Sequence, residues 1–177
     1  MAPPKYKVLV VGYGHLAKAL LSKQFLKSST VHAINSKKQI FHINLNIKLK
    51  SLNQSYDYIF LLVKPNTFKE IGDTFKDYIN KNSIIISCMA GVLIENLSNK
   101  LNTNKIVRIM PNVMAKSNKS QTYLFSKNKS LINTNLKKLL SPLGILIVAS
   151  KEDQMNLATS VYGSGPAFIA FLINAYI

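Results

Sequence analysis

The chain has 177 residues, 47% of them hydrophobic, and a formal net charge of +16. This composition excludes a disordered chain and allows one well-packed core with the beginning of a second unit. Arg108 is the only arginine and the lysines are scattered, which favours a solvated basic surface over a nucleic-acid-binding one. Cys88 is the only cysteine, which excludes a disulfide within the chain and suits a cytoplasmic protein.

The first half of the chain alternates apolar strands with helical segments. Strands are predicted at three apolar runs: Tyr6–Val11, Val31–Ile34 and Tyr58–Val63. Helices are predicted over His15–Leu26 and over Thr67–Ile79, the latter opened by Thr67 and Glu70 in a capping-box pattern. Residues 36–54 alternate apolar with other side chains, which predicts extended chain where a crossover helix is usual.

The second half continues the same alternation and then becomes helical. Strands are predicted over Ser83–Ser87, Ile106–Met110, Gln121–Phe125 and Ile145–Ala149, and helices over Ile94–Leu101 and Leu131–Leu140. We expect an α/β fold of the Rossmann type, a doubly wound and mostly parallel sheet over residues 1–150. Residues 151–177 are expected to begin a helical domain. We expect no signal peptide, and no apolar run long enough to span a bilayer.

A glycine-rich turn follows the first predicted strand. The segment Gly12-Tyr13-Gly14-His15-Leu16-Ala17 reads G-x-G-x-x-A at the opening of a helix. Gly12 permits a tight turn, Gly14 lets a pyrophosphate approach the backbone, and Ala17 lets the helix pack closely on the sheet. An ordinary tight turn is the alternative, but the strand-turn-helix context favours a dinucleotide site. Its predicted members in this turn are Gly12, Gly14, His15, Leu16 and Ala17.

The end of the second predicted strand bears on the choice of cofactor. NAD-specific sites usually place an acidic residue here for the ribose 2′-hydroxyl, and this segment has none. Its polar and cationic residues suit a 2′-phosphate, so we predict NADP, with NADPH preferred over NADH. The residues expected to bind it are Asn35, Ser36 and Lys37. The alternative is that Lys37 and Lys38 are surface residues of a lysine-rich chain.

Four more segments follow in a characteristic order. They are Val63-Lys64-Pro65, Ser87-Cys88-Met89-Ala90-Gly91-Val92, Arg108-Ile109-Met110-Pro111-Asn112, and the run Thr159-Ser160-Val161-Tyr162-Gly163-Ser164-Gly165-Pro166-Ala167-Phe168. Together they resemble the pyrroline-5-carboxylate reductase family, whose members make L-proline by reducing 1-pyrroline-5-carboxylate with NADPH. The resemblance spans Gly12 to Ala167.

The resemblance implies a cytoplasmic oxidoreductase of proline biosynthesis with a small imine substrate. It implies no metal, nucleic acid or membrane, and a homo-oligomer. It places Val63, Lys64, Pro65, Cys88, Met89 and Ala90 beside the nicotinamide half of the cofactor. It places Pro111, Asn112, Gly163, Ser164, Gly165 and Pro166 near the substrate. Hydride transfer needs no nucleophilic side chain, so no catalytic residue is assigned and Cys88 is interpreted as a small wall residue.

The chain also departs from the family pattern. Val113-Met114 stand in place of the usual Thr-Pro, Asn156 in place of an acidic residue, and Tyr162 in place of a serine. The chain ends at Ile177, before the motif that holds the substrate carboxylate in the family. We therefore expect poor turnover and self-association of the isolated chain. The alternatives are an inactive, truncated dinucleotide-binding remnant, or another Rossmann imine or β-hydroxyacid reductase.

Overall fold

The computed structural model describes residues 6–52, 55–71 and 75–177. Within them lies a nine-stranded sheet with the order β4-β3-β2-β1-β5-β6-β7-β8-β9. Its strands are β1 Tyr6–Val11, β2 Ser29–Ile34, β3 Ile40–His42, β4 Ile47–Leu49, β5 Tyr58–Leu61, β6 Ile84–Ser87, β7 Ile106–Met110, β8 Ser120–Phe125 and β9 Gly144–Val148.

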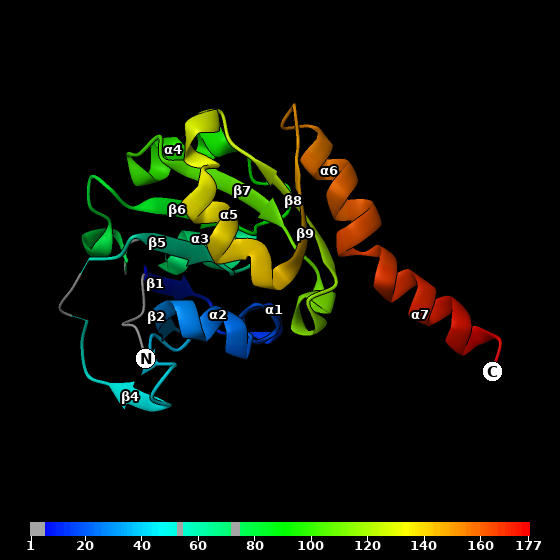
Figure 1. The fold of residues 1–177 in the computed structure, drawn as a ribbon, viewed down its shortest axis with the longest axis horizontal. Coiled ribbons are helices and arrows are strands. Elements are labelled where there is room, and N and C mark those ends of the chain that lie inside the picture. Colours follow the sequence, from blue (N-terminus) through cyan, green and yellow to red (C-terminus); the bar gives the residue numbers. More distant parts are fainter. Residues whose placement is uncertain (1–5, 53–54, 72–74) are drawn as a thin grey trace.

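The centre of the sheet is parallel, as predicted. Strands β2, β1, β5, β6 and β7 run in one direction, and β8 returns antiparallel to β7 with β9 parallel to it. The chain leaves β1 for β2 on one side and later adds β5 on the other (Figure 1). The point between β1 and β5 is therefore the topological switch, where ligands bind at the carboxyl ends of the strands in doubly wound sheets.

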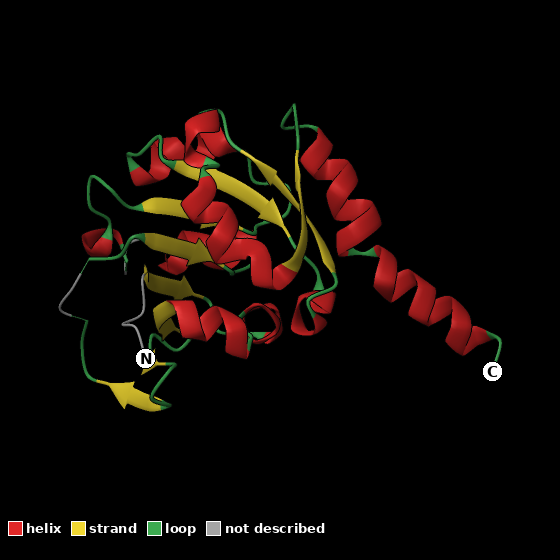
Figure 2. Ribbon diagram, viewed as in Figure 1, coloured by secondary structure: helices red, strands yellow, loops and turns green. Residues whose placement is uncertain are grey.

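Helices cover both faces of the sheet (Figure 2). They are α1 His15–Leu20, α2 Lys23–Ser28, α3 Pro65–Ile71, α4 Ile94–Leu101, α5 Thr134–Leu140, α6 Gln154–Ala158 and α7 Gly165–Ala175. Short 3₁₀ turns are η1 Lys76–Tyr78, η2 Val113–Ser117, η3 Lys129–Leu131 and η4 Ser141–Leu143, and η5 Thr159–Gly163 is a π-helical turn. One core lies under α1, α2 and α5, and a second lies under α3 and α4. The central strands are buried on both faces, and successive side chains of β1 enter the two cores in turn.

Two helix predictions need correction. The helix predicted over residues 15–26 is interrupted, because the Ser22 hydroxyl accepts from the Phe25 backbone N–H (3.3 Å) and caps a new helix. The capping box at Thr67 is wrong, since α3 already begins at Pro65, a residue suited to the first helical turn. The Glu70 side chain and residues 72–74, which the predicted helix included, lie outside the described part of the chain.

The expected extended segment at residues 36–54 is a β-hairpin. Strand β3 pairs antiparallel with β2 and with β4, so the hairpin stands where a crossover helix is usual. Because β4 then runs parallel to β2, the end of β4 returns toward the turn that follows β2.

Of the two C-terminal helices, α6 lies beside the sheet and α7 extends away from it (Figure 1). Met155 and Ala158 of α6 are buried against β7 and β8, whereas the large apolar side chains of α7 are exposed. Residues Gln154–Ala175 form a 22-residue helical segment with enough length and hydropathy to cross a bilayer. The expectation that no apolar segment reaches this length is therefore wrong. Length and composition alone are weak evidence for a membrane, because core helices meet the same criteria.

Candidate functional site

The glycine turn lies at the switch point of the sheet. Gly12 has φ +98°, and a Cβ atom there would lie 2.6 Å from the Leu62 carbonyl oxygen at the end of β5. Its backbone N–H donates to the Ile34 carbonyl oxygen (2.8 Å) at the end of β2. Gly12 thus joins the ends of the three central strands, and only glycine fits the position.

The next part of the turn faces open space. Gly14 precedes α1, and a Cβ atom at Gly14 would meet no atom of the described residues within 4 Å apart from its chain neighbours. His15 is exposed and Leu16 is half-buried, while Ala17 is fully buried against the sheet. The first turn of a helix leaves backbone N–H groups without partners in the helix, so α1 presents donors beside this open space. A pyrophosphate site at this turn stays a prediction of the glycine pattern.

Asn35 organises the turn after β2. Its side-chain oxygen accepts from the backbone N–H groups of Lys37 (3.0 Å) and Gln39 (2.9 Å). Its amide nitrogen donates to the Gln39 side chain (2.9 Å). Ser36 and Lys37 remain exposed. The oxygen and the nitrogen of the Asn35 side-chain amide are therefore both used to hold the turn. The side chains that remain exposed here are those of Ser36 and Lys37.

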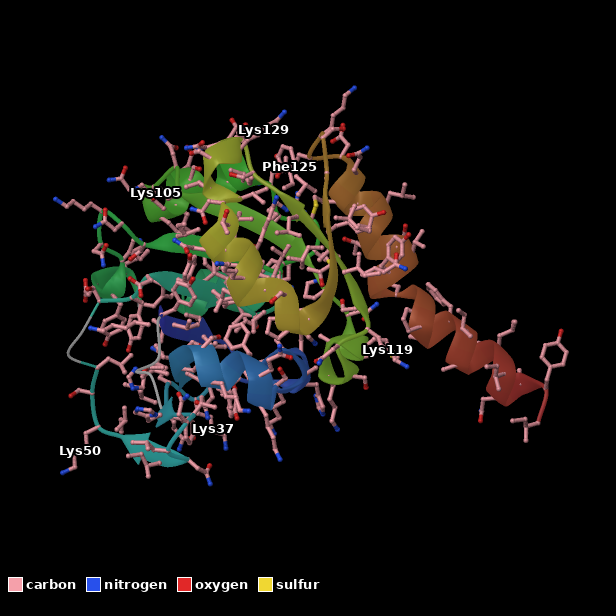
Figure 3. The ribbon with its side chains drawn as sticks, in the orientation of Figure 1. Lys37, Lys50, Lys105, Lys119, Phe125 and Lys129 are labelled. Carbon is pink, nitrogen blue, oxygen red and sulfur yellow. The ribbon has the colours of Figure 1, made fainter. Side chains whose placement is uncertain are left out.

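The hairpin adds lysines that the sequence pattern did not single out. Lys48 and Lys50 line a cavity of about 580 Å³ together with Lys38, Gln39, Ile40 and Leu49. In Figure 3, Lys37 and Lys50 lie at the same end of the molecule, beside the hairpin. The sequence indicated only that residues 36–54 are extended. It did not indicate with which strand this segment pairs, so the position of its lysines could not be predicted. The fold thus gathers positive charge around the turn after β2.

The loops after β5 and β6 lie next to each other. The Cys88 backbone N–H donates to the Leu61 carbonyl oxygen (3.1 Å), which joins the start of the loop after β6 to the end of β5. Val63 is half-buried, whereas Lys64, Pro65 and Ala90 are exposed. Burial raises the pKa of the Cys88 thiol, which makes it a poor nucleophile. Met89 is 2% exposed and packs into the core, so only its backbone can meet a ligand.

The end of β7 contacts the C-terminal helical segment. The Asn112 side chain accepts from the Met114 backbone N–H (3.0 Å) and donates to the Tyr162 carbonyl oxygen (2.9 Å). A Cβ atom at Gly163 would lie 3.5 Å from the Met110 sulfur. Pro111 and Asn112 are buried, while Ser164, Gly165 and Pro166 are half-buried where α7 begins. The two predicted substrate-proximal segments are therefore neighbours.

A buried ion pair lies behind these strand ends. Arg108 Nη1 on β7 lies 2.9 Å from Glu152 Oε1, with side-chain exposures of 1% and 16%. The same carboxylate oxygen accepts from the Ile94 backbone N–H (2.8 Å). The sequence contains both charged residues but no spacing that pairs them, because they lie 44 positions apart.

Comparisons with known proteins agree with this geometry. Residues 7–91 match the family described as "NADP oxidoreductase coenzyme F420-dependent". The pyrroline-5-carboxylate reductase of Staphylococcus haemolyticus is 32% identical, over 97% of this chain and 68% of its own length. The corresponding enzyme of Staphylococcus epidermidis is 28% identical with the same coverage.

Solved structures of similar fold include two reductases of the same name. The structure from Coxiella burnetii superposes with a TM-score of 0.73 at 22% identity, covering 97% of this chain and 68% of the other. The Plasmodium falciparum pyrroline carboxylate reductase, solved with NADP bound, has a TM-score of 0.73 at 19% identity and covers 96% and 67%. The relative from Staphylococcus haemolyticus, 32% identical over 68% of its own length, shows the family. Together with the glycine turn at the switch point of the sheet, it shows that the chain belongs to the pyrroline-5-carboxylate reductase family of NAD(P)-dependent oxidoreductases.

Proposed function

We propose that the protein reduces 1-pyrroline-5-carboxylate to L-proline with NADPH. The observation that carries the proposal is the convergence at one sheet edge of four segments that the family resemblance implies. The glycine turn and the loops after β5, β6 and β7 all follow neighbouring parallel strands. When bound, NADPH would supply a hydride to the C=N carbon of the imine, whose nitrogen takes up a proton.

The residues at this edge fit a dinucleotide. Gly14 leaves space for a pyrophosphate, and the N–H groups of the first turn of α1 would donate to it. The loop after β6 would form a wall beside the nicotinamide, with the Cys88 thiol protonated and inert. The protein would contribute placement and a shielded surface, which are the main needs of hydride transfer.

The preference for NADPH belongs to the same proposal. The turn after β2 carries Ser36 and Lys37 where NAD-specific sites have an acid, and the cavity beside it is lined by Lys38, Lys48 and Lys50. A cluster of ammonium groups favours a ligand with an added phosphate. The NADP bound in the Plasmodium falciparum relative is consistent with this preference.

The helical segment after Ser150 belongs to the proposal as the beginning of a second unit. Its first part packs on the sheet through Glu152, Met155 and Ala158, and it meets the end of β7 near Tyr162 and Gly163. Beyond this point α7 projects away from the sheet (Figure 1). We infer that the first 150 residues bind the dinucleotide and that the segment from residue 151 borders the imine.

A direct assay tests the proposal. NADPH oxidation is followed by absorbance with 1-pyrroline-5-carboxylate, and in parallel with 2-dehydropantoate, which our proposal excludes as a substrate. We expect slow turnover with the imine and none with 2-dehydropantoate, and a lower KM for NADPH than for NADH. Turnover with 2-dehydropantoate and none with the imine would contradict the proposed substrate.

A further inference from the structure

Glu152 connects three elements that are distant in the sequence. It lies two residues before α6. Its Oε1 accepts from Arg108 Nη1 of β7 (2.9 Å) and from the backbone N–H of Ile94 (2.8 Å), the first residue of α4. Arg108 Nη2 is buried and has no partner in the described part of the chain, so Glu152 alone balances this buried charge there. A single carboxylate therefore fixes the relative positions of α4, α6 and β7.

The carboxylate caps α4 from outside the helix. The residue before α4 is Leu93, whose side chain offers no hydrogen-bond acceptor to the first turn. Glu152 takes that place, and its negative charge is favourable at a helix N-terminus. Arg108, held rigid within the sheet, fixes the carboxylate against Ile94. Without Glu152, the Ile94 N–H group would lose its acceptor in a site where Ile94 is 2% exposed.

This cap is one of two anchors of the loop over residues 88–93. At its start, the Cys88 N–H binds the Leu61 carbonyl oxygen and the Ser87 hydroxyl accepts from the Met89 N–H (3.3 Å). At its end, Ile94 is held by Glu152. Between the anchors, Gly91 has φ +70° and Ala90 is exposed. The course of the loop between a fixed strand and α4 therefore depends on the carboxylate.

We propose that Glu152 is a positioning residue, which holds the 88–93 loop against the nicotinamide half of the cofactor while Arg108 holds Glu152. The inference rests on the proposed function, because the family resemblance assigns that half of the cofactor to this loop. It adds a residue from the turn before α6 to the control of cofactor placement. The same carboxylate ties the segment that leads to Gly163 to the cofactor loop.

The test compares two ligands and removes both charges together. Replacing a buried ion pair by apolar residues is often neutral for stability, so the double variant R108M/E152L is expected to fold. We expect it to bind adenosine 2′,5′-bisphosphate, which lacks the nicotinamide half, within about twofold of wild type. Its dissociation constant for NADPH should rise by about tenfold or more, the loss typical of a buried hydrogen bond to a charged group. The measurement is isothermal titration calorimetry with each ligand.

Two matched variants separate positioning from general effects. Glu152→Gln keeps an oxygen that accepts from Ile94 and Arg108, and should restore NADPH affinity to within about threefold of wild type. The variant E95L/K127M removes the exposed ion pair Glu95–Lys127 (3.7 Å) and should bind both ligands normally. Glu95 lies on α4, next to Ile94, so this variant changes the same helix without touching Glu152. Equal weakening of both ligands in R108M/E152L, or no weakening of NADPH, would overturn the inference.

A measurement on the wild-type protein covers the case in which the double variant does not fold. The amide hydrogen of Ile94 should exchange more slowly with NADPH bound than with adenosine 2′,5′-bisphosphate bound, because only NADPH contacts the loop that the amide anchors. Equal exchange with the two ligands would overturn the inference. If folded wild-type protein binds adenosine 2′,5′-bisphosphate and NADPH with equal affinity, the proposed site of the nicotinamide is wrong and the inference falls with it. If it binds neither, the proposed function itself fails.

Discussion

The two glycines of the first turn have different structural roles. Gly12 is required by the fold, since its φ of +98° and the Leu62 carbonyl oxygen leave no room for a side chain. Gly14 has extended backbone angles and no protein atom near its missing side chain. Gly12 is therefore assigned to the fold and Gly14 to the proposed ligand, and substitutions at the two positions can test these roles separately.

Replacing Gly14 by valine should abolish cofactor binding and leave the protein folded. The valine side chain would occupy the space proposed for the pyrophosphate, and beyond the chain neighbours no atom of the described residues lies within 4 Å of its Cβ position. We expect a loss of stability below about 1 kcal/mol, the usual range for an unfavourable N-cap residue. Calorimetry with NADPH and thermal unfolding by circular dichroism check both parts. Normal affinity in G14V would show that the turn does not hold the cofactor.

Valine at Gly12 provides the opposite control. It imposes a positive φ on a branched residue beside the end of β5, so it should destabilise the fold by roughly 1–3 kcal/mol or more. A G12V protein as stable as wild type would contradict this assignment of roles.

At the scale of elements, the β3–β4 hairpin depends on a neutral histidine. His32 on β2 lies opposite His42 on β3, with ring centroids 4.6 Å apart, and its Nδ1 is 2.8 Å from the Tyr56 hydroxyl. Burial, and to a smaller extent the charge of His42, lowers the pKa of His32 from 6.5 to about 4. The hairpin therefore buries the His32 ring in its uncharged form, at a pH at which an exposed histidine would already bind a proton.

This arrangement predicts a loss of stability in acid. The unfolded chain binds a proton at His32 near pH 6.5, whereas the folded chain binds it only near pH 4. The contribution of the neutral His32 to the free energy of unfolding is therefore complete above pH 6.5 and is lost as the pH falls to about 4. The free energy of unfolding, measured by urea titration across this range, should fall less steeply for His32→Gln than for wild type. Parallel curves for the two proteins would show that His32 is not responsible.

The hairpin lysines should contribute to cofactor preference. Lys48 and Lys50 line the cavity beside the turn after β2, and exposed charge pairs each contribute about 0.2–1 kcal/mol. The variant K48A/K50A, which removes two such charges, should therefore weaken NADPH binding by about two- to thirtyfold and leave NADH unchanged. K129A/K137A is the control, since Lys129 lies at the opposite end of the molecule in Figure 3. Equal effects of the two double variants on NADPH would indicate only the general positive field.

Local patterns predicted the elements better than the connections between them. The predicted strand at Ile106–Met110 and helix at Ile94–Leu101 match the structure at both ends, because apolar periodicity and flanking polar residues define them. The break at Ser22 and the start of α3 at Pro65 were missed, since one local capping group outweighs helical periodicity. The sequence also could not show that the segment over residues 36–54 pairs with β2.

At the scale of the whole molecule, the candidate site is formed by several loops along one edge of the sheet and not by a single sequence motif. The sequence predicted the loops individually, and the parallel sheet accounts for their meeting at the carboxyl ends of β1, β5, β6 and β7. The pairing of Glu152 with Arg108 and Ile94 could not be predicted, because it depends on how α6 packs over β7 and no local signal encodes that. What sequence reasoning missed are the tertiary contacts that hold the loops in register.

The exposed helix α7 predicts how the molecule behaves in solution. It carries no charged residue, and Phe168, Ile169, Phe171, Leu172 and Ile173 are each between 55% and 75% exposed. A helix that is apolar on every side is normally buried, and a contiguous apolar surface of this kind promotes association. We expect wild-type protein to self-associate, with a second copy covering α7.

Charge on this helix should separate the copies and leave the dinucleotide site intact. The variant F168E/F171E places carboxylates where two copies would meet, and both positions lie beyond the contacts that α6 and η5 make with the sheet. We expect a monodisperse monomer by multi-angle light scattering, against larger and concentration-dependent species for wild type. NADPH affinity should be the same for both when compared at low concentration. A wild-type protein that is already a monodisperse monomer would show that the apolar surface of α7 does not drive association of this chain.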